Sequence, residues 1–460
     1  MTGAPPDLAS IDLARVDLAI RGGRFLTGAA PVPDGSTLLI SGSRIAGFAE
    51  PGAFVPARRT LDASGRLILP GLVNAHTHAA MSLFRGLADD LPLSGFLSRI
   101  WPAEAASVSP GMVYWCSLLS MAEMLLAGTT TLADSYFFEE EVARVATQAG
   151  MRAVCAQGLL DLATPDAAAG RGLERLEAFL ESCPASELVR PAVFCHSVYT
   201  CSAATLQAAR ELARRAGCRF YIHLAETAQE QRECYRKRGA TPLRLLDRLG
   251  VLGGGCVLVH AVHLDEDEIG LAAERGACVV HCPESNLKLA SGIAPVALML
   301  GRGLRVGLGT DGAASNNDLD MFGETASAAR LMSLTRLDLP HLDLIWGGRG
   351  GQGGRPAGQR AGLELACLRM ATAGGAQALG LECGELAAGS LADVVIAEPG
   401  LEGLWPGERE AQAVWGLSRG SVRTVVVGGR VVVEEGRLLT VDLPEVLAKV
   451  RELAAALPRP

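Results

Sequence analysis

The central part of the sequence alternates short apolar segments with longer amphipathic ones, and this alternation restricts the fold more than any other feature. Eight of the apolar segments are predicted to be strands: residues 72–78, 129–137, 152–161, 191–199, 219–226, 256–264, 277–285 and 304–312. Between them lie helix-like segments such as 111–128 and 203–217, in which apolar residues recur every three to four positions. Repeated strand–helix units are typical of parallel sheets. We therefore expect an α/β fold, a (β/α)8 barrel over residues 69–385, with active-site groups at the carboxyl ends of its strands.

Short β-like segments also occur at both ends of the chain. Residues 16–28, 36–50, 390–399 and 423–436 contain apolar runs broken by turn residues. In the last of these, Gly428 and Gly429 supply the positive φ angles that a tight hairpin turn requires. A chain of 460 residues is long enough for a barrel and a second, smaller core. We expect residues 1–68 and 386–445 to form one small β-sandwich domain, followed by a C-terminal helix or tail over 446–460.

Histidines gather where the predicted strands end. His76 and His78 end the first barrel strand in "NAHTH", and residues i and i+2 of a strand point to the same side. A lone histidine is more often a hydrogen-bonded core or surface residue than a ligand. However, His223 ends the fifth strand and Asp311 the eighth, and closure of a barrel brings these ends together. Three imidazoles and one carboxylate suit Zn²⁺, with Fe²⁺ or Mn²⁺ as alternatives. The fourth strand, "PAVFCHSVY", has no lysine that could be carboxylated to bridge two ions, so we expect one metal ion.

Two further groups at the strand ends suit acid–base chemistry. Glu226 follows His223 by three residues in "HLAET", where a solvated loop carboxylate or the start of a helix is the alternative interpretation. Beside a metal-activated water, Glu226 can take a proton from that water and deliver it to the substrate. His260, which ends the sixth strand, and Asp311 can hold and polarise the same water. We therefore regard Glu226, His260 and Asp311 as candidate catalytic residues.

Five motifs together resemble the amidohydrolase superfamily: "NAHTH", "HLAET", "HAVHL", "HCPESNLKLASG" and "GTDGAASNN". The likeness extends over nearly the whole chain and is greatest to deaminases of 5'-methylthioadenosine and S-adenosylhomocysteine, with the triazine chlorohydrolases as relatives. It implies the barrel and the split β-sandwich. It also implies the roles already inferred from the residues, namely zinc ligands at His76, His78, His223 and Asp311, a proton shuttle at Glu226 and a catalytic histidine at His260.

The same resemblance implies contacts to a substrate. Glu104, in "IWPAEA", matches a glutamate that binds ribose hydroxyls, and His196 matches a histidine that lines the pocket. Alternatively, Glu104 is a charged residue on a helix surface, and His196 is a buried hydrogen-bond donor. Arg171 matches a second pocket arginine, whereas Gln157 stands where one pattern in the family has arginine. Recognition of a substrate carboxylate is therefore left open.

The expected activity is the zinc-dependent hydrolytic deamination of an adenine nucleoside, namely 5'-methylthioadenosine, S-adenosylhomocysteine or adenosine. Water attacks C6, and ammonia leaves to give the inosine analogue. The alternative is an amidohydrolase that acts on another heterocycle, as an s-triazine chlorohydrolase or a deaminase of guanine or an oxidised purine does, because substrate choice depends on loops. A non-catalytic scaffold with the same fold is a third hypothesis.

Composition limits the other partners. The formal net charge of -8 provides no basic field for nucleic acid, so we expect a small-molecule substrate instead. The N-terminus lacks a basic segment followed by an apolar one, and no apolar run reaches about 18–20 residues, so we expect a cytoplasmic protein without membrane contact. A homo-oligomer is compatible with the sequence, which fixes no symmetry. Residues 345–360 are rich in glycine and arginine and read as a flexible loop, with phosphate binding as an alternative.

Overall fold

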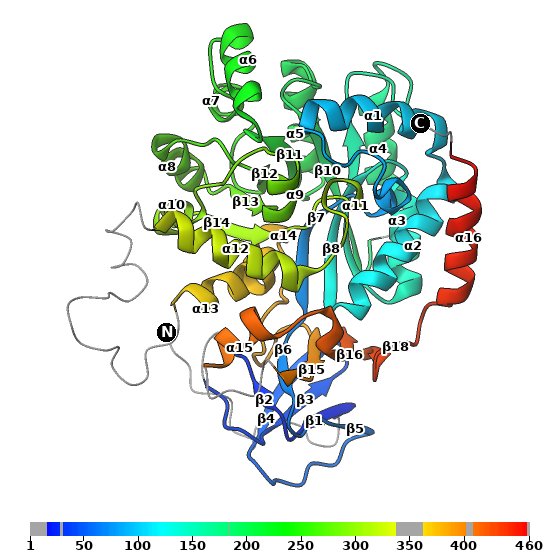
Figure 1. Ribbon diagram of the computed structural model, residues 1–460, viewed down its shortest axis with the longest axis vertical. Coiled ribbons are helices and arrows are strands. Elements are labelled where there is room, and N and C mark those ends of the chain that lie inside the picture. Colours follow the sequence, from blue (N-terminus) through cyan, green and yellow to red (C-terminus); the bar gives the residue numbers. More distant parts are fainter. Residues whose placement is uncertain (1–15, 28–30, 184, 337–361, 402–407, 458–460) are drawn as a thin grey trace, which may run out of the picture.

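Eight parallel strands form the centre of the molecule (Figure 1). The computed structural model describes residues 16–27, 31–183, 185–336, 362–401 and 408–457. The eight strands follow one another in sequence order, each hydrogen-bonded to the next: β7 (Leu72–Thr77), β8 (Thr129–Tyr136), β9 (Arg152–Leu159), β10 (Val189–Ser197), β11 (Phe220–Leu224), β12 (Cys256–His260), β13 (Cys278–His281) and β14 (Arg305–Leu308). Each predicted strand segment overlaps one of them, although β10 begins two residues before its predicted segment, and the predicted barrel is confirmed.

Side chains of the barrel strands alternate between the interior of the barrel and its helical cover. On β12, Val257 and Val259 belong to the apolar cluster inside the barrel. Cys256 and Leu258 on the same strand belong to the larger cluster outside. Strands that are covered on both sides need apolar residues at nearly every position, which explains the continuous apolar runs in the sequence. The polar residues of the barrel are thus concentrated at its strand ends.

The barrel closes between its first and last strands through side chains and tight backbone contact. The amide of Asn74 donates to Thr310 Oγ1 at 2.7 Å, and the backbone N–H of Thr310 donates to Asn74 Oδ1 at 3.1 Å. The N–H of Asp311 donates to the carbonyl of His76 at 3.1 Å. A Cβ at Gly309 would lie 2.8 Å from the backbone N and O of His76, so this approach requires glycine. Closure therefore places Asp311 beside His76.

Helices surround the barrel, and α1 lies across the end that is far from the terminal sheets (Figure 1). Their bounds are α1 (Leu93–Ser107), α2 (Pro110–Leu126), α3 (Glu139–Ala149), α4 (Gly172–Ser182), α5 (Ala203–Arg215), α6 (Ala228–Arg238), α7 (Pro242–Arg248), α8 (Glu266–Glu274), α9 (Pro283–Lys288), α10 (Val296–Gly301), α11 (Ala313–Asn316), α12 (Met321–Arg336), α13 (Gly362–Arg369), α14 (Gly375–Leu379), α15 (Arg409–Gly416) and α16 (Leu443–Ala455). A 3-10 helix covers Ala79–Phe84, directly after β7, and a π-helix covers Met370–Gly374, directly before α14.

Two further sheets form a separate unit from both ends of the chain, in the strand orders β4-β3-β1-β5 and β18-β17-β16-β15-β6-β2. The strands are β1 (Leu18–Arg21), β2 (Arg24–Phe25), β3 (Thr37–Ser41), β4 (Arg44–Ala49), β5 (Arg59–Asp62), β6 (Leu67–Pro70), β15 (Val394–Ala397), β16 (Val422–Val427), β17 (Arg430–Glu434) and β18 (Arg437–Leu438). β6 pairs with β15, which joins the two ends of the chain. β6 and α16 run across the predicted boundaries at 68/69 and 445/446, and the division at those residues remains a prediction.

The predicted hairpin near the C-terminus is present. β16 and β17 pair antiparallel on either side of Gly428 and Gly429, whose φ angles are 52° and 77°. Positive φ at both positions is the geometry that favours glycine in such a turn.

A buried ion pair joins the barrel to the terminal sheets. The guanidinium of Arg152, at the start of β9, donates to both carboxylate oxygens of Asp393 at 2.9 and 3.0 Å. The two side chains are only 3% and 0% exposed. Asp393 Oδ1 also accepts the N–H of Gly428 in the hairpin. A single carboxylate therefore fixes the hairpin and the barrel floor relative to one another.

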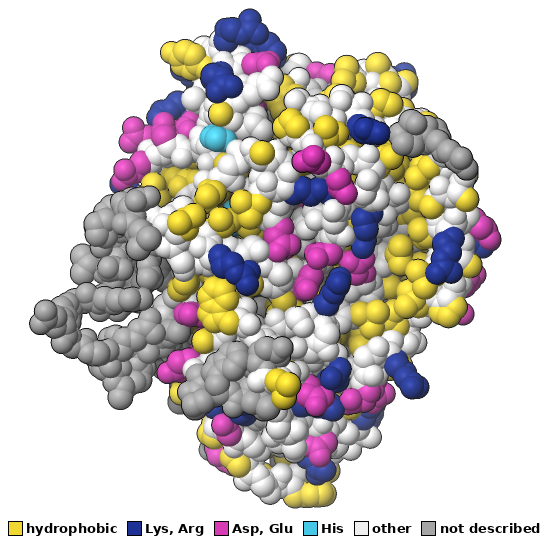
Figure 2. Space-filling model, viewed as in Figure 1, with side chains coloured by type: hydrophobic (Ala, Val, Ile, Leu, Met, Phe, Trp, Pro, Cys, Tyr) yellow, Lys and Arg dark blue, Asp and Glu magenta, His cyan; other side chains and the backbone are white. Residues whose placement is uncertain are grey.

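In the described part of the chain, no helix is both long enough and apolar enough to cross a membrane. All twelve cysteines are free thiols. On the face shown in Figure 2, acidic and basic side chains are interspersed. The glycine-rich segment 345–360 lies outside the described residues.

Candidate metal centre and active site

Three histidines and one aspartate converge at the carboxyl end of the barrel. One ligand atom from each of His76, His78, His223 and Asp311 lies within 4.8 Å of the others. The Nε2 atom of His76 lies 3.2 Å from Nε2 of His223 and 3.5 Å from Asp311 Oδ1. The Nε2 atom of His78 lies 3.2 Å from the same carboxylate oxygen. Segments that are far apart in the sequence thus direct four donor atoms at one point.

Neighbouring groups orient these donor atoms. His78 Nδ1 lies 2.6 Å from the backbone carbonyl of Ser135, which only accepts, so Nδ1 carries a proton and Nε2 is the ring atom that can bind an ion. The hydroxyls of Ser285 and Ser315 each donate to Asp311 Oδ2 at 2.7 Å. Asp311 Oδ1 is therefore left to face the histidines. Such outer hydrogen bonds are the usual means by which proteins orient metal ligands.

Burial determines the charge of this group. Burial lowers the pKa of His76 to about 4, and it lowers the pKa of His223 well below its usual value. Burial opposes ionisation of Asp311, but hydrogen bonds from His76 and His78 outweigh it and hold the pKa of the carboxyl well below its usual value. Burial opposes protonation of His78, but the hydrogen bond to Asp311 and the charge of that carboxylate outweigh it and raise the pKa of His78. At neutral pH, His76 and His223 are therefore neutral and Asp311 is a carboxylate, a combination that favours a cation.

The distances and chemistry of the donor set fit a small divalent ion. Ligands bound tetrahedrally at about 2.0–2.1 Å lie about 3.3 Å from one another. The three separations of 3.2–3.5 Å match this value. Three imidazoles with a carboxylate are typical of zinc and related ions.

Glu226 and His260 lie beside the donor atoms. Glu226 Oε1 accepts a hydrogen bond from the hydroxyl of Ser291 at 3.1 Å, and Oε2 lies 3.8 Å from His260 Nε2. Burial raises the pKa of Glu226. His260 Nδ1 lies 2.8 Å from Asn286 Oδ1, a carbonyl-type acceptor, so Nδ1 carries a proton. His260 Nε2 therefore faces Glu226 and the donor group.

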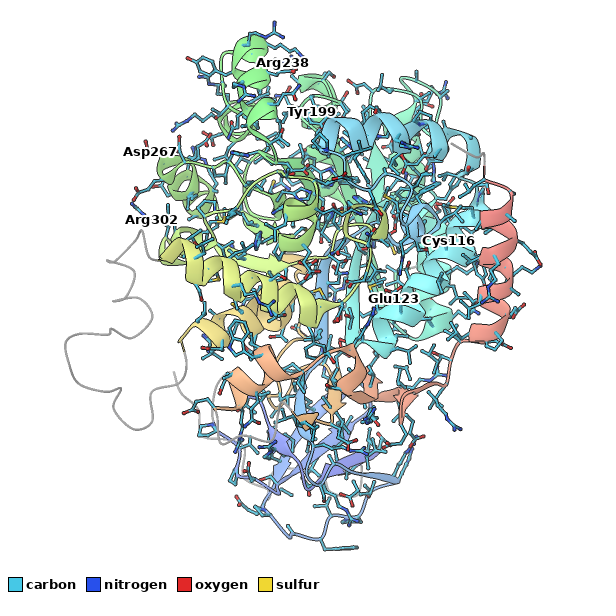
Figure 3. All side chains as sticks on the ribbon, in the orientation of Figure 1. Cys116, Glu123, Tyr199, Arg238, Asp267 and Arg302 are labelled. Atoms are coloured by element: carbon cyan, nitrogen blue, oxygen red, sulfur yellow. The ribbon has the colours of Figure 1, made fainter. Side chains whose placement is uncertain are left out.

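A cavity of about 550 Å³ opens onto these residues. Its inner wall includes His78, His223, Glu226, His260 and Asp311. The volume suits a small organic molecule. Tyr199, which is 46% exposed, lies at the end of the barrel away from the terminal sheets and marks the opening (Figure 3).

Glu104 and His196 also line the cavity. Glu104 Oε1 accepts the hydroxyl of Tyr136 at 2.6 Å, and burial raises the pKa of Glu104 to about 7. His196 Nδ1 lies 3.2 Å from the hydroxyl of Ser197, and the His196 ring lies edge-on to Trp101. Burial lowers the pKa of His196 to about 3, so its ring is neutral. Both residues lie where the sequence interpretation requires, and their contacts to substrate stay predictions.

Arg171 does not line the cavity. It precedes α4, its side chain is 67% exposed, and it forms an ion pair with Glu174. Gln157 is buried but donates its amide to Asp166 at 2.8 Å and does not line the cavity among the described residues. The structure thus separates Arg171 from the other predicted site residues.

Several residues that support the site lacked a sequence signal. Tyr136, Ser291 and Ser315 contact Glu104, Glu226 and Asp311, respectively. Ser315 does lie within "GTDGAASNN", four residues after Asp311, and its place on the following helical turn could have indicated it. Nothing local links Tyr136 to Glu104 or Ser291 to Glu226, because these contacts depend on packing.

Comparison with known proteins places this arrangement in a family. Residues 67–432 match the amidohydrolase family. The chain belongs to the amidohydrolase family. This confirms the predicted resemblance, and the amidohydrolase fold with its histidine–aspartate group makes the protein a metal-dependent hydrolase.

Individual amidohydrolases are similar over almost the whole chain. A protein of Syntrophobacter fumaroxidans named 5-methylthioadenosine/S-adenosylhomocysteine deaminase is 41% identical, with 99% of each chain covered. A 5'-deoxyadenosine deaminase of Methanothermobacter thermautotrophicus is 39% identical, covering 91% of this chain and 94% of its own. The crystal structure of an adenosine deaminase from Xanthomonas campestris with bound zinc is 34% identical with a TM-score of 0.87, covering 96% of this chain and 98% of that one.

Proposed function

We propose that this amidohydrolase is a zinc-dependent aminohydrolase that deaminates adenine nucleosides, giving the inosine analogue and ammonia. Candidate substrates are 5'-methylthioadenosine, S-adenosylhomocysteine, 5'-deoxyadenosine and adenosine, the compounds in the names of the relatives. The observation that carries the proposal is the position of Glu226, whose carboxylate lies beside the four donor atoms on the inner wall of the cavity.

The reaction needs an activated water and a group that moves protons. One zinc ion bound by His76, His78, His223 and Asp311 would lower the pKa of a bound water toward ~7 and so supply hydroxide at neutral pH. Glu226, held by Ser291, takes a proton from the attacking water and delivers it to N1 of the purine.

Two other side chains complete the proposed chemistry. His260 stabilises the charge that develops at C6, because Asn286 fixes its ring with Nε2 toward the reacting atoms. Asp311 helps to deprotonate the water through Oδ1, while its Oδ2 remains bound to two serine hydroxyls. The proton that Asp311 takes passes to the amino group, which then leaves C6 as ammonia.

The remainder of the substrate occupies the outer cavity. In this proposal Glu104, whose Oε1 accepts the hydroxyl of Tyr136, accepts hydrogen bonds from the ribose hydroxyls. His196 is neutral and lies beside Trp101, so it forms part of the wall against the nucleoside. A single zinc ion, a cytoplasmic location and assembly into a homo-oligomer stay predictions.

An ammonia-release assay on the zinc-loaded protein tests the proposal. The panel contains adenosine, 5'-deoxyadenosine, 5'-methylthioadenosine, S-adenosylhomocysteine, guanine and an s-triazine. We expect one ammonia and one inosine analogue per adenine nucleoside consumed. Turnover confined to guanine or the triazine would favour the alternative function, hydrolysis of another heterocycle. This chain shares its fold with an atrazine chlorohydrolase at 24% identity and with a guanine deaminase at 19% identity. Absence of turnover on the whole panel would reject the proposal.

A further inference from the structure

The cavity extends beyond the proposed ribose site along one face of α1. Glu104, near the C-terminal end of this helix, bonds Tyr136, whose ring centroid lies 6.2 Å from that of His78. Leu93 begins the helix and lies about 16 Å from Glu104 along its axis, at the rise of an α-helix. Between them, residues at three-to-four spacing line the cavity: Leu93, Phe96, Leu97, Ile100 and Trp101. Apart from Ser98 and Glu104, the residues of α1 that line the cavity are therefore apolar.

The loop after β9 provides another part of the wall. Four of its apolar residues line the cavity: Leu160, Leu162, Ala163 and Pro165. Leu162 is 55% exposed, which places it at the edge of the opening. A bridge between Thr164 and Ala167 closes the loop on itself. A substituent that leaves the ribose toward the opening would thus meet apolar side chains of both α1 and this loop.

The buried carboxylate of Asp166 holds this loop and pairs with the guanidinium of Arg175. Asp166 Oδ1 accepts the hydroxyl of Thr164 at 2.8 Å, and Oδ2 accepts Gln157 Nε2 at 2.8 Å and Arg175 Nε at 3.1 Å. The Asp166 side chain is 1% exposed. Arg175 also forms an ion pair with Glu140. The guanidinium of Arg175 is therefore paired with two carboxylates.

The charged groups that do face the cavity are acidic. They are Glu104, Glu226 and Asp311, and among the described lining residues none is lysine or arginine. Arg171 is exposed and bound to Glu174. A substrate carboxylate near the opening would find no basic partner on the described walls.

We infer that the enzyme selects adenine nucleosides by the charge of the 5' substituent, and that it prefers uncharged, apolar groups to a zwitterionic amino-acid tail. This inference rests on the proposed deaminase function. The compounds in the names of the relatives differ at the 5' position. 5'-Deoxyadenosine has hydrogen there, 5'-methylthioadenosine has a methylthio group, and S-adenosylhomocysteine has a homocysteinyl group. An ionic group placed against apolar side chains loses its hydration without gaining a partner, whereas a methylthio group gains burial.

A comparison of kcat/KM across four substrates tests the inference. The substrates are 5'-deoxyadenosine, 5'-methylthioadenosine, S-adenosylhomocysteine and 5'-(3-methylbutylthio)-5'-deoxyadenosine, whose tail has the branching of homocysteine with methyl groups in place of the charged groups. We expect the 3-methylbutyl compound to stay within about tenfold of 5'-methylthioadenosine, and S-adenosylhomocysteine to fall at least about 100-fold below it.

Three other results would contradict either this inference or the proposed function. If S-adenosylhomocysteine lies within about fivefold of its uncharged analogue, charge does not decide selectivity and the inference fails. If both long substrates are poor, length decides and the inference also fails. If no adenine nucleoside is a substrate, the proposed function fails instead.

Leu162 offers a direct gain-of-function variant. Leu162→Arg places a guanidinium at the exposed edge of the loop, where it can form a charge-assisted hydrogen bond with the homocysteine carboxylate. We expect the ratio of kcat/KM for S-adenosylhomocysteine to that for 5'-methylthioadenosine to rise about tenfold. Leu162→Met changes the shape without adding charge and serves as the matched control. An equal ratio in the two variants would contradict the placement of the 5' substituent beside this loop.

Discussion

The Nε2 atoms of His76 and His223 lie 3.2 Å apart, although 147 positions separate the two residues in the chain. Both side chains are buried, and burial holds both rings in the neutral form at pH 7. The two nitrogens and Asp311 Oδ1 therefore surround one small space that can hold a cation. The proposed chemistry depends on this relationship.

Glu226→Gln is expected to lower kcat by about 10²–10⁴-fold, because an amide cannot accept and return the proton. Zinc content, measured by elemental analysis, should not change, since Glu226 is not among the donor residues. Glu452→Gln, at a position 66% exposed on α16, is the control and should keep full activity. A Glu226→Gln enzyme with more than a tenth of the normal kcat would remove Glu226 from the proposed role.

Asn286→Ala should lower kcat about 10–100-fold, because His260 Nδ1 loses its acceptor and its ring is no longer fixed. Asn286→Asp keeps an acceptor oxygen and should recover much of the activity. Steady-state kinetics on 5'-methylthioadenosine, with KM little changed, would identify a positioning role. Equal activity of the alanine variant and the unchanged protein would show that the contact has no part in catalysis.

Arg152→Met should destabilise the protein by about 3–5 kcal/mol, because it leaves Asp393 as a buried charge without its partner. Denaturant unfolding followed by circular dichroism measures the change. Arg214→Met is the matched control, because Arg214 also pairs with a carboxylate but on the surface, and it should have little effect. Similar unfolding midpoints for the two variants would contradict the role of the buried pair.

Glu230 makes stability depend on pH. Burial raises its pKa to about 8 in the folded protein, whereas the unfolded chain has the ordinary value near 4.5. Between these values the folded state binds a proton that the unfolded state lacks, so this contribution to stability is complete below about pH 4.5 and is lost as the pH rises to about 8.

Unfolding midpoints at several pH values should therefore fall more steeply with rising pH in the unchanged protein than in Glu230→Gln. Glu233→Gln, on the same helix, is the control, because hydrogen bonds from Gln229 and Lys237 lower the pKa of Glu233 to about 2, below this window. Parallel pH profiles for the unchanged protein and Glu230→Gln would refute the assignment.

The fold and the donor group could be predicted because both follow from short-range patterns. Apolar runs identify parallel strands, and closure of the barrel brings the carboxyl ends of these strands together. His76, His223 and Asp311 could therefore be grouped without knowledge of any contact. The family resemblance added Glu104 and His196, which do line the cavity.

The details that packing decides could not be predicted. Asn74 and Thr310 close the barrel across 236 positions, and no local pattern connects them. Arg171 and Arg175 lie one helical turn apart in the sequence, yet packing of α4 turns only Arg175 toward Asp166, while Arg171 faces solvent. The sequence around the two arginines contains no pattern that distinguishes them.

Metal content measured with activity tests the central claim most directly. Elemental analysis of the purified protein, loaded with zinc and then dialysed, should give about one zinc per chain, with deaminase activity proportional to it. His223→Ala, which removes a donor atom, should lose both together, and a chelator should abolish activity that zinc then restores. A protein that deaminates adenine nucleosides without metal, or whose His223→Ala variant still holds one zinc per chain and remains active, would contradict the account.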